Sequence, residues 1–470
     1  MKHFNKIFLL VTALVALSCD SEIEDIAPEN DLSAEVIFST FTTIDAATVG
    51  IYDGMQDGGF IGQPEYISDY MSDNVNFVGS FPTLQDIRDF NANATNTSIA
   101  GQWFDIFDVI RDANNIIINL PGVDPANVSF ISASNSANFE TLRTQFIGEA
   151  HFSRALANFQ GVNMFAQPFQ FSNGSNLGMP LVTEFFEGDV EPFRLARSTV
   201  NETHAFIESD LIIAMNSLPE TNDIRASSTA ARALLSRLYL YREQWNDAAT
   251  MANEVIGTSG FSLAPDFTFY NNPSSEHIFR VINQPDDPAF GNPFDLYYNP
   301  TSNNGRGDLT FSDDLIAAFE AEPGDFRFSL SIEDVDASDN AARFTTKYPN
   351  GATSESDPNV LRMGEMYLNR AEANLRGGTT IGDTPLNDVN AIRLRAGLAP
   401  LTAVTLDDIL LERRKELAFE GHRRMDLLRN NLNLRPDGGA ISAPGSDKVI
   451  LPIPTDELNA NPNAAQNPGY

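Results

Sequence analysis

The chain has 470 residues, of which 42% are hydrophobic, and its formal net charge at pH 7 is −34. This composition supplies ample material for a buried core. A surface this acidic repels nucleic acid and anionic lipid, which excludes both as binding partners of the folded protein.

The N-terminus has the features of a lipoprotein signal. Lys2 and Lys6 precede a mostly apolar run, and Cys19, the only cysteine of the chain, follows it. The run is shorter than the ~20 residues that span a bilayer and has the proportions of a secretory signal. We therefore predict a signal peptide over 1–18, a lipid on Cys19 and an acidic tether over 19–40; the alternative is a secreted protein without an anchor. No other long apolar run occurs, so this lipid is the only membrane attachment that the sequence predicts.

Apolar residues at three- and four-residue spacing predict a series of amphipathic helices. The spacing of Trp103 with Phe107 and Ile110 assigns the Trp103 indole to the core rather than to a ligand platform. The predicted helices of the N-terminal half cover residues 44–56, 102–120, 139–164 and 199–218.

Two later segments have the pattern of tetratricopeptide-like helix pairs. In residues 229–257, Ser236 stands where a small residue lets two helices approach closely. Residues 360–396 repeat the step from a small residue to a tyrosine at Gly364 and Tyr367. Such units bury their faces on one another, so the sequence predicts a mainly α, helical-hairpin scaffold.

The stretches 58–100 and 258–358 differ from this scaffold. They are rich in Gly, Pro, Asn, Asp and aromatic residues, and they lack a sustained helical period. Long irregular segments inside a compact protein are usually functional or disordered, and the interspersed aromatic residues favour order.

The C-terminal third carries the most specific motifs. Residues 412–429 read ERRKELAFEGHRRMDLLR, and the chain ends LPIPTDELNANPNAAQNPGY. Three further segments occur in the same order as in one known family: 149–165, 230–241 and 361–376. Together, these five segments and Cys19 make the whole chain, from Cys19 to Tyr470, resemble the SusD/RagB family of outer-membrane nutrient-binding lipoproteins.

The resemblance implies one SusD-like domain over 41–470. It would consist of about four tetratricopeptide-like helix pairs and an irregular capping region with small β elements, formed near 58–100 and 258–358. The resemblance also implies a non-enzymatic lipoprotein on the outer-membrane surface. Such a protein captures oligosaccharides or polysaccharide and delivers them to a SusC-like TonB-dependent transporter. No cofactor is expected.

A charged cluster in the C-terminal motif has two interpretations. On one continuous helix, Glu416 and Glu420 would share a face, as would His422 and Asp426. A hydrolase uses paired carboxylates or a His–Asp pair of this kind. We favour an ion-paired helix that locks the C-terminal segment, because the family motif is structural there and no established catalytic motif occurs.

Residues 334–340, DVDASDN, have part of the spacing of a calcium loop. Asp339 stands where an EF-hand requires Gly, and Thr345 stands where it requires Glu. An EF-hand is therefore not predicted, and no residue is assigned to a metal. A calcium site of irregular geometry stays open in so acidic a chain.

The ligand face is expected in the two irregular stretches, as in the resembling family. Sugar recognition needs flat aromatic faces for the pyranose ring, with amides and carboxylates for its hydroxyl groups. We expect Phe77, Tyr297 and Tyr298 to be partly exposed and to converge, although about 220 residues separate them. The full set of predicted ligand-binding residues is Asp73, Asn76, Phe77, Phe81, Tyr297, Tyr298 and Asn299. A RagB-like peptide-binding lipoprotein and, less favoured, a surface glycosidase are the alternatives.

Overall fold

A computed structural model describes residues 34–186, 188–284 and 293–470. The predicted signal peptide, Cys19 and most of the predicted tether lie outside these residues. Among the described residues, no helix is long and apolar enough to cross a membrane.

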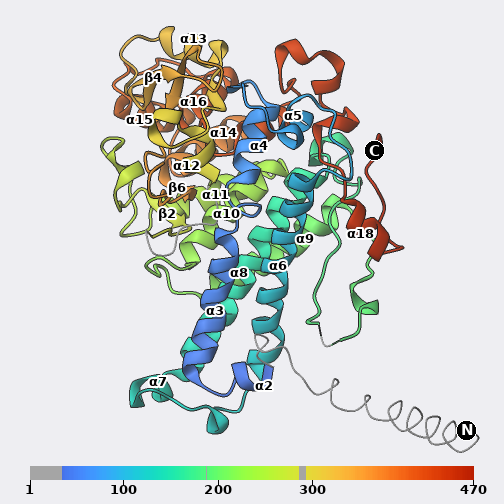
Figure 1. Cartoon of the computed structure of the whole chain (residues 1–470). Coiled ribbons are helices and arrows are strands. Elements are labelled where there is room, and N and C mark those ends of the chain that lie inside the picture. The colour runs from blue at the N-terminus through green and yellow to red at the C-terminus, as the bar shows by residue number, and fades with distance from the viewer. Residues whose placement is uncertain (1–33, 187, 285–292) are drawn as a thin grey trace, which may run out of the picture.

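Long helices packed side by side form the scaffold (Figure 1). Eight helices of the described chain form four consecutive pairs, and each pair packs on the next. The predicted mainly α, helical-hairpin architecture is confirmed. The eight helices are α3 (Phe41–Gln56), α6 (Thr97–Asn119), α8 (Phe139–Phe165), α9 (Val200–Ser217), α10 (Ser228–Tyr241), α11 (Trp245–Ile256), α14 (Met363–Gly377) and α15 (Pro385–Arg395).

Side-chain caps fix where several of these helices begin. The Thr199 hydroxyl accepts from the backbone N–H of Glu202, whose carboxylate accepts from Thr199 in return, and this capping box starts α9. Asn96 accepts from two N–H groups at the start of α6, so that helix begins five residues before the predicted start at 102.

The two irregular stretches form the capping region over one end of the scaffold (Figure 1). Together with the adjoining strand β6, their described residues form short helices and three two-stranded antiparallel sheets, β1–β3, β2–β6 and β4–β5. These helices have six to nine residues, too few turns to show a clear period in sequence. The elements are α4 (Gln63–Met71), β1 (Val75–Phe77), α5 (Pro82–Arg88), β2 (His277–Arg280), α12 (Pro293–Tyr298), β3 (Leu309–Phe311), α13 (Asp313–Glu320), β4 (Ser331–Val335), β5 (Ala341–Thr345) and β6 (Asn359–Arg362).

The remaining helices are short or belong to the C-terminal motif. The charged residues of 412–429 lie on two helices and the turn between them rather than on the one ion-paired helix that was predicted, because Phe419 and Gly421 have φ of 67° and 78° and turn the chain there. Two helices, α16 and α17, replace it. The remaining helices are α2 (Ala34–Ile37), α7 (Ala133–Ala137), α16 (Leu406–Glu416), α17 (Arg423–Arg429) and α18 (Thr455–Ala460).

Two positions assigned to the helical core are buried as predicted. The Trp103 side chain is 2% exposed, and its ring meets the edge of Phe165 with 4.9 Å between centroids. Ser236 is fully buried, and its hydroxyl donates across the α10–α11 contact to the carbonyl of Ala248 at 3.0 Å.

Ser236→Phe should overpack this contact, because a benzyl group has no space where two helix backbones approach closely. We expect the free energy of unfolding to fall by about 1–3 kcal/mol. Urea denaturation measures the change. Ser209→Phe, at an exposed position of α9, is the matched control and should stay within about 0.5 kcal/mol of the wild type. Equal stability of the two variants would contradict the proposed register of the repeat.

Candidate functional site

The two predicted ligand-face stretches meet in space. Strands β1 and β3 pair antiparallel, with Phe77 opposite Leu309. Helix α12 packs on α4 in the same region. A row of rings joins the two segments, with centroid distances of 4.5 Å for Tyr297–Tyr66, 5.2 Å for Tyr66–Tyr70 and 4.7 Å for Tyr70–Phe77. The predicted convergence of the segments is confirmed.

The predicted exposure of two of the three rings is wrong. Phe77 is 8% exposed, because the alternation of strand β1 turns it inward and turns Asn76 outward. Tyr298 is 1% exposed, and its hydroxyl donates to Asp69 at 2.6 Å. Burial raises the pKa of Asp69 to about 7 even though this hydrogen bond favours the charged form. Tyr297, its neighbour on α12, is half-buried.

Two polar residues predicted to bind the ligand, Asp73 and Asn299, instead make hydrogen bonds inside the protein. The Asp73 carboxylate accepts two hydrogen bonds from Arg423, both at 2.7 Å, in a bidentate pair. The Asn299 side chain is buried and donates to the carbonyls of Asp295 and Tyr348 at 3.0 and 2.7 Å. Their hydrogen-bonding groups are engaged inside the protein rather than turned toward a ligand.

Arg306 joins the accessible rings into one surface, and the sequence analysis missed it. Its guanidinium lies 5.5 Å from the Phe81 ring centroid and 5.6 Å from that of Tyr297. Asp308 accepts from Arg306 Nε at 2.6 Å and fixes its direction. Phe81 is 43% exposed. We call Asn76, Phe81, Tyr297 and Arg306 the aromatic ledge.

The aromatic ledge has the chemistry for a flat polar ligand. Two rings offer apolar faces, the Asn76 amide is exposed, and the terminal nitrogens of Arg306 make no hydrogen bond to any described residue. Gly79 lets the backbone beside the ledge pack closely on Asp308 and Phe77, because a Cβ there would lie 2.5 Å from atoms of both residues. The only sequence signal for Arg306 is its place between two glycines in an aromatic-rich segment.

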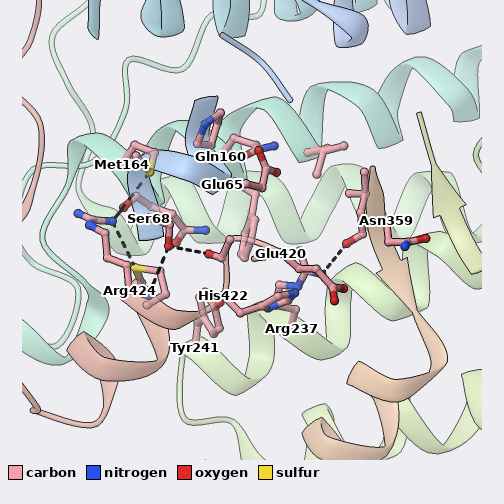
Figure 2. Close-up of a pocket in the computed structure, with 17 residues that line it drawn as sticks. Glu65, Ser68, Gln160, Met164, Arg237, Tyr241, Asn359, Glu420, His422 and Arg424 are labelled. Atoms are coloured by element: carbon pink, nitrogen blue, oxygen red, sulfur yellow. Dashed lines mark hydrogen bonds between the residues drawn. The ribbon is translucent and has the colours of Figure 1, made fainter. Parts of the chain in front are cut away.

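A small cavity near α4 is a separate feature (Figure 2). Side chains from α4, α8, α10 and the turn before α17 line it, among them Glu65, Arg237 and His422. Burial raises the pKa of Glu65 to about 7 and lowers that of His422 to about 4. Its volume of about 60 Å³ suits a few water molecules rather than a sugar ring.

The charged residues of the C-terminal motif belong to a buried ion network. Glu416 and Glu420 both contact Arg362, at 2.7 and 2.6 Å, and all three side chains are at most 1% exposed. Burial opposes ionisation of Glu420, but the charges of Arg362 and Lys347 outweigh it and lower its pKa to about 2. The network is balanced, with six cations and six acids: Arg327, Lys347, Arg362, Arg393, Arg395 and Lys415 against Glu276, Glu322, Asp325, Glu412, Glu416 and Glu420.

This network connects the capping region to the scaffold, which supports the structural interpretation of the motif. Gly364 adjoins it, because a Cβ at that position would lie 3.0 Å from Glu416 and 3.1 Å from Glu276. The small residue that the repeat pattern required at this position therefore makes room for buried charges.

The DVDASDN segment forms the turn between β4 and β5. The Asp336 carboxylate accepts from the backbone N–H groups of Ser338 and Asn340, at 2.8 and 3.0 Å, and so closes the turn. Over the described residues, no group of three or more His, Cys, Asp or Glu side chains is placed to hold a metal ion.

Comparisons with known proteins agree with this fold. Two family models match: the SusD family over residues 338–470, and a family described as starch-binding and associating with the outer membrane over residues 25–240. A SusD-like protein of Bacteroides ovatus is 25% identical over 91% of this chain and 83% of its own length.

Solved structures extend the likeness. A SusD superfamily protein of Bacteroides thetaiotaomicron aligns with a TM-score of 0.80 and 26% identity, covering 91% of this chain and 100% of the other. A laminarin-binding SusD-like protein aligns with a TM-score of 0.73 and 27% identity, covering 92% and 100%. The chain belongs to the SusD family, and its helical scaffold is the tetratricopeptide-like scaffold of that family. SusD family proteins are non-catalytic binding proteins associated with carbohydrate and the outer membrane.

Proposed function

We propose that this protein is a lipid-anchored, cell-surface glycan-binding protein that captures oligosaccharides or polysaccharide at the aromatic ledge. It then delivers them to a SusC-like TonB-dependent transporter in the outer membrane. The single domain over 41–470, with the ledge in its capping region, is part of this proposal.

The observation that carries the proposal is the placement of Arg306 between Phe81 and Tyr297. An exposed ring and a half-buried ring with a fixed guanidinium between them match a pyranose, which has apolar C–H faces and hydroxyl groups at its rim. The names of relatives point to the same ligand class, since one matching family is described as starch-binding and one similar structure as laminarin-binding.

Tyr297→Ala and Arg306→Ala should each weaken glucan binding about tenfold, because each removes one contact surface of the ledge. A tenfold loss corresponds to about 1.4 kcal/mol. Isothermal titration with laminarin and soluble starch measures the change, and melting temperatures check the fold. Phe104→Ala, which removes an exposed ring on α6, is the control and should leave affinity unchanged.

Wild-type affinity of both ledge variants for the glucan that the protein binds would contradict the ledge as the site.

Phe77→Ala should behave differently from them. Its ring is buried, so its loss should lower stability by about 3–5 kcal/mol without a separable binding defect. A library of peptides, titrated in parallel, tests the RagB-like alternative.

The delivery step predicts a stable partner. Purification from native membranes in mild detergent should recover this protein together with a much larger β-barrel protein. Adding the bound glycan should leave that complex intact, because the ligand is passed within it. Recovery of the lipoprotein only as a free monomer would contradict the transport role and leave glycan capture standing.

A further inference from the structure

A shallow, largely open hollow lies on the helical scaffold, at the turn between α10 and α11. Its volume is about 390 Å³, and it shares no lining residue with the aromatic ledge. The end of α14 forms its other side. The lining residues are Gln244, Trp245, Asn246, Asp247, Arg376 and Gly377.

The Trp245 indole is a rigid, partly exposed surface within this hollow. The Arg376 guanidinium stacks 5.0 Å from its ring centroid. Arg376 is held in turn by Glu372, at 3.1 Å, and by a hydrogen bond to Asn430. Gly377 allows the close approach, because a Cβ there would lie 3.1 Å from Trp245 Cβ. The indole is therefore fixed before any ligand arrives, which lowers the entropic cost of binding.

Polar groups surround the indole without partners inside the protein. Asn246 and Asp247 are exposed, and their side chains make no hydrogen bond to any residue that the structure describes. The first N–H groups of α11 have no intrahelical partner, and Gln244 supplies no side-chain cap. A partly exposed indole, an amide, a carboxylate and free backbone donors are thus gathered at one shallow, open place.

We propose that this hollow is a second saccharide subsite, which binds a neutral pyranose unit against Trp245. The inference rests on glycan capture as the proposed function and extends it to a second point of contact. Asp247 and Arg376 carry opposite charges, so the hollow offers no net charge to favour an ionic ligand. A long polysaccharide that reaches both sites would gain apparent affinity by avidity, whereas a short oligosaccharide would not.

The tryptophan content of the chain gives this subsite its own reporter. The chain has two tryptophans, and Trp103 is buried at 2% exposure, so acrylamide quenches mainly Trp245. We expect saturating laminarin or amylose to protect Trp245 from quenching in the full chain. The same protection should occur in Arg306→Ala, in which the ledge is impaired, and this separates the two sites.

Binding variants supply the second measurement. Trp245→Ala should lower apparent affinity for the polysaccharide about tenfold and leave affinity for a trisaccharide bound at the ledge unchanged. Asn246→Ala with Asp247→Ala keeps the indole and changes two exposed side chains, so it should fold normally and weaken polysaccharide binding in the same direction. Phe104→Ala is again the control.

Wild-type polysaccharide affinity in Trp245→Ala, or no protection of Trp245 by any glycan of a neutral-glycan panel, would overturn the subsite. Protection of Trp245 in a protein whose ledge variants bind normally would overturn the ledge and support this subsite. Protection lost only when Arg306 is removed would show that the quenching change is transmitted from the ledge, and would also overturn the subsite.

Discussion

Replacing Glu416 by alanine is expected to lower the free energy of unfolding by about 3–5 kcal/mol. The Glu416 carboxylate is fully buried and contacts three guanidinium groups, those of Arg395, Arg362 at 2.7 Å and Arg327 at 3.6 Å. Alanine removes the negative charge and leaves these cations short of a partner where water does not reach them. Urea denaturation of the full chain, followed by far-UV circular dichroism, measures the loss.

Two further variants test whether the loss of stability comes from removing a buried charge or from removing any charge. Glu320→Ala makes the same chemical change at an exposed position of α13 and should stay within about 0.5 kcal/mol of the wild type. Arg362→Met should be as damaging as Glu416→Ala, because it leaves Glu276 and Glu420 without their shared cation. If Glu416→Ala unfolds at the same urea concentration as Glu320→Ala, the network does not stabilise the junction between cap and scaffold.

The scaffold was predictable because long helices repeat their pattern. Helix α6 shows its apolar stripe over 23 residues, so its existence and the burial of Trp103 follow from spacing. The small residue at Ser236 likewise predicted a close helix contact. Sequence failed where elements are short or where the chain turns: α4 has 9 residues, and the break between α16 and α17 depends on the φ of Phe419 and Gly421. Gly421 was the one available signal for that break.

The candidate site was likewise predictable in part. That the two aromatic segments meet could be predicted, because both are rich in rings that lack a helical period. Which rings face outward could not, since strand β1 has three residues and takes its orientation from β3, more than 230 positions away. Arg306 was missed because its role exists only once Phe81 and Tyr297 stand on either side of it.

In cells that lack the proposed partner transporter, Cys19→Ala should move the protein from the membrane fraction to the soluble fraction. The lipid on Cys19 is the only membrane attachment that the sequence predicts, and an acidic surface gains nothing from anionic lipid headgroups. Folding should be unaffected, because α3 begins at Phe41 with its own cap from Thr40, far along the chain from Cys19. Cell fractionation with immunoblotting measures the location, and the melting temperature of the released protein measures the fold.

Ser21→Ala, two residues beyond the cysteine, is the matched control and should remain in the membrane fraction. The released Cys19→Ala protein should still bind the same glycan with wild-type affinity, because the aromatic ledge belongs to the folded domain. Uptake of that glycan by cells should nevertheless fall, since the captured ligand is no longer held at the transporter. In cells that lack the partner transporter, a Cys19→Ala protein that stays in the membrane pellet after a salt wash would contradict the lipid as the only membrane attachment.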